Sequence, residues 1–336
     1  MDSEVSSHFE MRRFIFLDYI RGLMILWMLV VHISLNYGHI TYGQSFSSFS
    51  IFSWLSFFMV PFYFFSGYLF RSESDFKDFL WRKECSLLFP YIIYLLFGAI
   101  IYELYKVARF SCLDHTIFYG LLPSGMPFYN TPLWFLVSLF FVNVSYYWIK
   151  KLPSPVKNLI IIVFFFYAWY AEGKGYPQVL MHRSFFPGIV YFHFGYILRR
   201  NEEIIPRRTL LILACVLYLG INIMDPQCIW FVENYQSSGN YFFNLLFSLS
   251  GTYILYCLTQ YITKPGKFFG LLGRYSLVIY ATHRPLLNYV YEPMILYLFP
   301  KISYGVFLSV AILFLLLMAY IVFVMLRKLC PIVVGG

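Results

Sequence analysis

Long apolar runs recur along the whole chain, and each is about as long as a helix that crosses a membrane. A helix needs roughly 20 apolar residues to cross about 30 Å of hydrocarbon. Hydrophobic residues make up 60% of the 336 residues and charged residues only 12%. A water-soluble surface cannot be covered by such a composition. The sequence therefore predicts an integral membrane protein.

The apolar runs predict an all-α fold, a polytopic membrane helix bundle of about ten transmembrane helices. The expected spans are residues 14–37, 49–70, 87–107, 133–149, 158–171, 184–198, 209–224, 241–262, 270–290 and 303–326. The fifth and sixth spans are short, and a re-entrant hairpin in their place leaves the orientation of every later helix unchanged. No long polar block interrupts the runs, so we expect residues 1–336 to form a single integral-membrane domain.

The basic residues alternate between the two sides of this arrangement. With the N- and C-termini in the cytoplasm, 17 of the 25 Lys and Arg residues fall on the inner side, as the positive-inside rule requires. Topology and contact with anionic membrane lipid then account for the net charge of +9, and no nucleic-acid partner is needed. The first run is too long for the core of a cleavable signal peptide, so we expect it to be a retained helix.

The first run contains three residues that hydrocarbon disfavours: Asp18, Arg21 and His32. A charged side chain at mid-bilayer costs about 2.5 to 3.5 kcal/mol, so such residues usually face a cavity, a partner or a substrate. Arg21 and His32 are eleven positions apart, which places them about 16 Å apart along one face of a helix. Alternatively, Arg21 reaches the headgroups with Asp18 as its partner, and His32 makes a hydrogen bond between helices.

A second group of ionisable residues lies in "GRYSLVIYATHRPLLNYV", residues 273–290. On the expected topology His283 falls in the outer half of its span, at a depth similar to that of His32. Arg284 is then either a site residue or an anchor at the outer interface, and Pro285 a kink. Two histidines at one depth favour a site more than either does alone.

The six cysteines show no paired metal-ligand spacing, so no metal site is expected. Cys112 and Cys228 both fall in expected outer loops, where they either form a disulfide or remain unpaired. Those loops, residues 108–132 and 225–240, either form a lid over a substrate mouth or simply connect helices.

Four motifs, in order, resemble those of the integral-membrane acyltransferase family 3, whose members move acyl groups onto sugars of bacterial surface polysaccharides. The first is "LDYIRGLMILWMLVVH", which has the family's arginine-to-histidine spacing. The others are "VPFYFFSGYLFR", which ends at Arg71, "LWFLVSLF", which contains Trp134, and "YSLVIYATHRPLL", with its His-x-Pro-Leu pattern. The motifs extend over residues 17–287, and the family resemblance also implies about ten helices.

The resemblance implies an O-acyltransferase of the inner (plasma) membrane that takes an acetyl group from cytoplasmic acetyl-CoA, which is a substrate and not a permanent cofactor. The acceptor is expected to be a hydroxyl of a saccharide, either polysaccharide or lipid-linked. His32 is expected to be the general base, although an acyl-imidazole intermediate is an alternative. Arg21 and Arg71 are expected to bind the coenzyme A phosphates.

Four further residues receive expected roles at the same site. Asp18 is expected to orient Arg21. His283, as a further catalytic residue, and Trp134 are expected to shape the thioester and acceptor site, and Trp134 and Arg284 to contact the substrates. Asp18 as a helix cap or an ion-pair partner is an equally good interpretation.

Many members of the family also carry a soluble esterase-like domain, for which this sequence has no polar block. We therefore expect the chain either to act alone or to pass the group to a separate protein. A transporter of a polar or lipid-linked substrate is the alternative function, since intramembrane Arg and His residues are common in transporters. A purely structural partner in polysaccharide export is a third, and it would make His32 dispensable.

Overall fold

The computed structural model describes residues 2–42, 54–71, 75–110, 127–171, 182–225, 230–231, 236–237, 240–261, 267–299 and 301–330. These residues are almost entirely helical, and the exception is an antiparallel pair of two-residue strands, β1 (Trp230–Phe231) and β2 (Gln236–Ser237). The expected all-α fold is therefore confirmed.

The helices follow one another along the chain. They are α1 (Asp2–Tyr42), α3 (Val60–Tyr68), α4 (Phe76–Lys83), η1 (Glu84–Leu88), α5 (Phe89–Phe110), η3 (Phe128–Leu133), α6 (Trp134–Ile149), α7 (Ser154–Ala171), α8 (His182–Arg200), α9 (Arg207–Met224), α10 (Tyr241–Gln260), α11 (Lys267–Arg274), α12 (Ser276–Leu286), η4 (Leu287–Tyr291), α13 (Glu292–Leu298) and α14 (Tyr304–Leu329).

Seven helical segments of the described residues are long and apolar enough to cross a membrane. They are Phe16–Gly38, Phe76–Phe110, Phe128–Ile149, Ser154–Ala171, Arg207–Met224, Tyr241–Gln260 and Tyr304–Leu329.

The three other expected spans have a different form. In the second span, the described helix is the nine-residue α3. The sixth contains the 19-residue α8, whose last turn is basic, and a turn at Tyr275 divides the ninth into α11 and α12. A total of about ten crossings, and the side on which each terminus lies, remain predictions.

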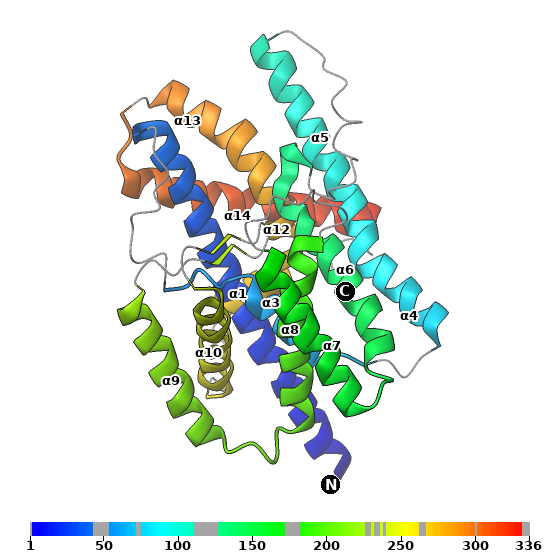
Figure 1. Cartoon of the computed structure of the whole chain (residues 1–336). Coiled ribbons are helices and arrows are strands. Elements are labelled where there is room, and N and C mark those ends of the chain that lie inside the picture. The colour runs from blue at the N-terminus through cyan, green and yellow to red at the C-terminus, as the bar shows by residue number, and fades with distance from the viewer. Residues whose placement is uncertain are drawn as a thin grey trace.

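Helix α1 runs through the middle of the molecule, with α9 and α10 on one side and α6 to α8 on the other (Figure 1). It contacts α10, α11, α12 and α14. Met24, Leu29 and Ile33 on α1 are completely buried. In this central helix Asp18 and His32 are only partly exposed, and contact with protein is the environment that such residues require in a membrane.

Helices α3 and α8 cross at unusually short range because each supplies a glycine at the crossing. A Cβ atom on Gly67 would clash with the backbone carbonyl of Phe192, and one on Gly195 with the carbonyl of Phe64. Helices in a membrane gain little from the hydrophobic effect when they associate, so small residues that permit close contact are a main source of packing energy. The glycine pair therefore fixes the position of α3 against the bundle.

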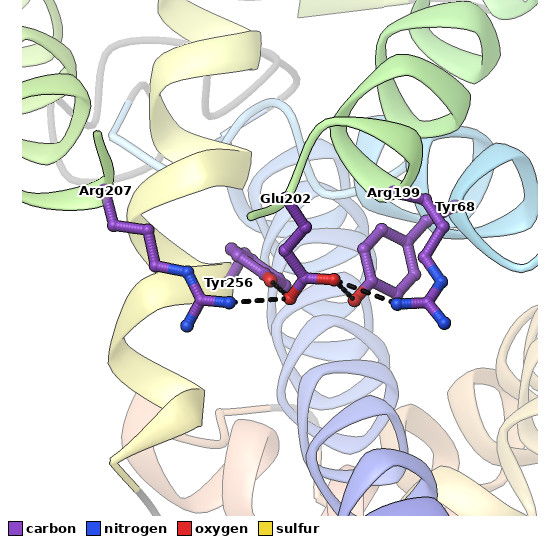
Figure 2. Close-up of polar contacts among 5 residues, drawn as sticks. All are labelled: Tyr68, Arg199, Glu202, Arg207 and Tyr256. Carbon is purple, nitrogen blue, oxygen red and sulfur yellow. Dashed lines mark hydrogen bonds and ion pairs between the residues drawn. The ribbon is translucent and has the colours of Figure 1, made fainter. Parts of the chain in front are cut away.

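A buried carboxylate joins four helices near the turn between α8 and α9 (Figure 2). Glu202 Oε2 accepts hydrogen bonds from Tyr68 Oη and Arg199 Nη1, both at 3.0 Å. Its Oε1 accepts from Tyr256 Oη at 2.5 Å and from Arg207 Nη2 at 3.0 Å. The Glu202 side chain is only 12% exposed, so its charge is held by these four donors. The cluster ties the end of α3 to α8, α9 and α10.

Candidate active site

His32 lines a cavity of about 180 Å³ between α1, η3, α6 and α12, which we call the His32 cavity. Its walls include Met28 and Asn36 from α1, Trp134 from α6 and Arg284 from α12. Met28, His32 and Asn36 are spaced four positions apart and therefore share one face of the helix. A cavity is one of the environments that the position of His32 within an apolar run indicated, and the structure places His32 on one.

The His32 ring is held in one tautomer by the backbone. Its Nδ1 lies 3.0 Å from the carbonyl oxygen of Met28, one turn earlier. A carbonyl oxygen only accepts, so Nδ1 carries the hydrogen and Nε2 keeps a lone pair. This is the state that a general base needs before it removes a proton.

His283 lies directly behind His32. The two imidazole centroids are 5.0 Å apart, and His283 is 1% exposed whereas His32 is partly exposed. His283 Nδ1 lies 2.7 Å from the carbonyl oxygen of Tyr280, so its Nε2 also keeps a lone pair. Among the described residues this Nε2 has no hydrogen-bond partner. The two histidines, which the sequence places at similar depth, thus lie side by side, and His32 is the one in the wall of the cavity.

A second cavity, of about 170 Å³, lies further toward the N-terminus of α1, and we call it the Arg21 cavity. Its walls contain Arg21 together with the hydroxyl groups of Ser66, Ser86 and Ser276. The two cavities share wall residues at Met59 and Tyr280, and α1 lines both. The two cavities therefore lie one after the other along the same face of α1, with a guanidinium in the wall of one and an imidazole in the wall of the other, about 16 Å apart along the axis.

Asp18 lies one turn before Arg21 and is placed between two cations. Its Oδ1 is 3.7 Å from Arg21 Nη1, and its Oδ2 is 4.0 Å from Arg274 Nε on α11. Within the described part of the chain, the walls of the two cavities do not include Asp18. This geometry favours the interpretation of Asp18 as an ion-pair partner that orients Arg21.

Arg71 follows the end of α3 and is exposed. Arg71 is not among the described residues that line the Arg21 cavity. Its expected contact with coenzyme A phosphates remains a prediction.

Trp134 begins α6 and is 2% exposed, with part of its surface on the His32 cavity. The preceding 3₁₀ segment η3 is anchored by Asn130, whose Nδ2 donates to the carbonyl oxygen of Ala281 on α12 at 2.9 Å. That carbonyl is available because Pro285, four residues later, has no N–H to donate to it. The proline in the His-x-Pro motif thus positions η3, and with it Trp134, beside α12.

Arg284 lines the His32 cavity and belongs to a polar network at that end of α1. Its Nη1 donates to Asn36 Oδ1 at 3.1 Å. Asn36 Nδ2 in turn donates to Asn288 Oδ1 at 2.7 Å and to Glu292 Oε2 at 3.1 Å. Arg284 is therefore a cavity residue, and its guanidinium is held by hydrogen bonding within the protein.

Sequence reasoning missed Asn36, Asn288, Glu292 and Tyr280. Their spacing in the sequence could have indicated three of these residues. Asn36 is four residues after His32, and Asn288 and Glu292 are four and eight residues after Arg284. Such spacings place polar groups on the face of a helix that already carries an ionisable residue.

The predictions about cysteine pairing, the two outer loops and metal binding concern residues outside the two cavities. Cys112 and Cys228 lie outside the described residues, as do most of the two loops proposed as a lid. In the part of the chain that is described, no group of three His, Cys, Asp or Glu residues is arranged to hold a metal ion.

A known protein family covers the part of the chain that forms both cavities. This part includes the face of α1 from Arg21 to His32 and the helices that carry Trp134 and His283. A family model described as an acyltransferase domain, that of acyltransferase family 3, matches residues 14–327. No curated protein and no solved structure matches the chain. The chain belongs to acyltransferase family 3.

Proposed function

We propose that this membrane acyltransferase moves an acetyl group from cytoplasmic acetyl-CoA to a hydroxyl group of a cell-surface or lipid-linked saccharide, with His32 as the general base. The observation that carries the proposal is the pair of cavities along one face of α1, with Arg21 in one and His32 in the other. A polyanionic donor with a long thioester arm suits such a path, because its phosphates and its reacting carbon are far apart.

In this proposal Arg21 binds coenzyme A phosphates at the cytoplasmic side, and Arg71 adds a second cation. The pantetheine arm extends through the shared region at Met59 and Tyr280 into the His32 cavity. The serine hydroxyls of the Arg21 cavity offer hydrogen bonds to the amide groups of that arm. The inner (plasma) membrane is the proposed location, since only there does the cytoplasm supply the donor on one side and the cell surface the acceptor on the other.

At the His32 cavity the chemistry is a direct transfer. His32 Nε2 removes the proton of the acceptor hydroxyl while its oxygen attacks the thioester carbon. The tetrahedral intermediate collapses with cleavage of the carbon–sulfur bond, and the proton on His32 passes to the departing thiolate. The products are the O-acetyl ester and free coenzyme A. Trp134 in the cavity wall offers a flat apolar surface for the acetyl group or the sugar ring.

Transport of a polar or lipid-linked substrate is the second candidate, because neighbouring cavities inside a helix bundle also suit a transport path. Membership of an acyltransferase family favours group transfer. The two functions differ in product, since transfer changes the mass of the glycan and transport does not.

The test is expression of the wild type and of His32→Ala at matched levels, followed by mass spectrometry of surface and lipid-linked glycans. We expect one acetyl increment with the wild type and none with His32→Ala. His193→Ala is the matched control, because His193 is a buried histidine that bonds to Tyr146 away from both cavities. Identical unmodified glycans in all strains would refute the proposal.

A further inference from the structure

The polar network around Asn36 ends at the guanidinium of Arg284. Among the described residues of the His32 cavity wall, this guanidinium is the one group with a permanent positive charge. A guanidinium stays protonated in proteins and presents its N–H donors in a rigid plane. The hydrogen bond from Nη1 to Asn36 Oδ1 therefore restricts how that plane can be oriented.

The hydrogen bonds of Asn36 also fix which way its own amide points. Its Nδ2 donates to two acceptors, Asn288 Oδ1 and Glu292 Oε2, so its Oδ1 must face Arg284. Asn36 is 8% exposed, and the Glu292 carboxylate beyond it offsets part of the charge on Arg284. Arg284 is thus held beside the cavity by Asn36, which also lines the cavity, and Asn36 is held by Asn288 and Glu292, which are not among its described wall residues.

We propose that Arg284 contacts the thioester carbonyl oxygen and stabilises the negative charge that develops there, and that Asn36 and Glu292 are positioning residues for Arg284. The proposal rests on the proposed function and deepens it. It assigns Arg284 to the acyl donor, whereas the sequence indicated only a residue that contacts substrate.

Proximity to His32 favours this role over a role in acceptor recognition. His32 and Arg284 line the same cavity and interact electrostatically. When His32 takes a proton, two positive charges lie close together in a medium of low dielectric constant, which is unfavourable. A negative charge on the thioester oxygen between them removes that repulsion. The transition state is therefore stabilised more than the ground state, as catalysis requires.

The role fits each step of the transfer. As the acceptor oxygen bonds to the thioester carbon, the electron pair of the carbon–oxygen double bond moves onto oxygen, where Arg284 donates hydrogen bonds. When the double bond re-forms, the carbon–sulfur bond breaks and the thiolate takes the proton from His32. The same charge develops whether the attacking group is a saccharide hydroxyl or water, and this supplies the test.

The experiment uses inside-out membrane vesicles that contain the full chain, with isotopically labelled acetyl-CoA added outside. Coenzyme A release reports all turnover, including hydrolysis, and label in glycan reports transfer. Vesicles without the protein give the background. We expect Arg284→Met to lower both rates by the same factor, about 10²- to 10³-fold, as for removal of other donors to a developing oxyanion. Arg109→Met, which removes an exposed arginine at the end of α5, should leave both rates unchanged.

The outcomes separate the possible failures. If Arg284→Met lost glycan labelling but kept coenzyme A release, Arg284 would bind the acceptor, and the proposal would be overturned. Unchanged rates in this variant would also overturn it, while the proposed function would stand. A wild type that neither releases coenzyme A above background nor labels glycan would refute the proposed function itself.

A double-mutant cycle tests the positioning role of Asn36. Asn36→Ala should lower the maximal rate at least tenfold, while Asn36→Ala combined with Arg284→Met should be no slower than Arg284→Met alone, because residues that act through one group are not additive. Glu292→Gln should show the same pattern with a smaller loss. Effects that add independently of Arg284 would show that Asn36 and Glu292 have only a structural role.

Discussion

The imidazole rings of His32 and His283 lie edge to face, with their centroids 5.0 Å apart and their planes at 85°. Backbone carbonyls hold the Nδ1 atoms of both rings, so both rings have a basic Nε2. Only His32 belongs to the cavity wall that the described residues form. The pair is therefore unequal: His32 is placed to meet a substrate, and His283 to support His32 from behind.

Substitution of the two histidines by Asn should therefore have unequal effects. His32→Asn removes the base and should lower coenzyme A release by about 10²- to 10⁴-fold. His283→Asn keeps the base but changes its packing, and a small displacement of a reacting group costs up to about 10²-fold. Turnover of labelled acetyl-CoA in vesicles checks both. An equally complete loss with His283→Asn would give His283 a direct part in proton transfer.

The Glu202 cluster should contribute to stability and not to chemistry. Glu202→Ala removes the acceptor of two arginines and two tyrosine hydroxyls, and the loss of a hydrogen bond to a charged group costs about 1.5 to 3 kcal/mol. We expect a clear fall in the thermal unfolding midpoint of the purified protein in detergent. Glu203→Ala is the matched control, because the neighbouring Glu203 is exposed. Equal midpoints for the two variants would contradict a stabilising role for the cluster.

The residues that sequence reasoning placed correctly are those whose relation is local to one helix. Arg21 and His32 lie on one continuous helix, so their spacing alone predicts that they share a face at different depths. The expected depth of each histidine in its span placed His32 and His283 at a similar level, but only the fold shows that their ring centroids are 5.0 Å apart. Hydrophobic length predicted the all-α fold, because a bilayer admits few alternatives to helices.

The contacts that sequence reasoning missed join helices that are far apart in the chain. Asn36 and Glu292 are 256 residues apart, and neither has an unusual local context. The contact between Asn130 and Ala281 depends on a carbonyl left unpaired by Pro285, and only the fold shows which donor reaches it. Helix breaks were missed for a related reason. Hydropathy does not register a turn such as that at Tyr275, where the backbone departs from the helix for one residue.

The crossing of α3 and α8 should not tolerate a side chain at its glycines. Gly195→Ala places a methyl group against the backbone carbonyl of Phe64, and neither backbone is free to move without displacing a helix. We expect a loss of folded protein in detergent, measured by size-exclusion chromatography, or a strongly lowered unfolding midpoint. Gly220→Ala in α9 is the matched control, since nothing lies near its added methyl group. Wild-type behaviour of Gly195→Ala would mean that α3 and α8 are further apart than described.

Coenzyme A binding should depend on Arg21 and not on Arg274, although both arginines lie near Asp18. Arg21 lines a cavity, whereas the Arg274 side chain is 74% exposed. Loss of a charged hydrogen bond to phosphate costs about 1.5 to 3 kcal/mol, which corresponds to about 10- to 100-fold in affinity. Isothermal titration of the purified protein with coenzyme A should therefore show that much weaker binding for Arg21→Ala, and for Arg71→Ala if it adds the second cation. Arg274→Ala should stay within about twofold of the wild type, as is usual for an exposed charge. If Arg21→Ala and Arg274→Ala bound equally well, Arg21 would be an anchor to lipid headgroups, and the donor would have to enter by another route.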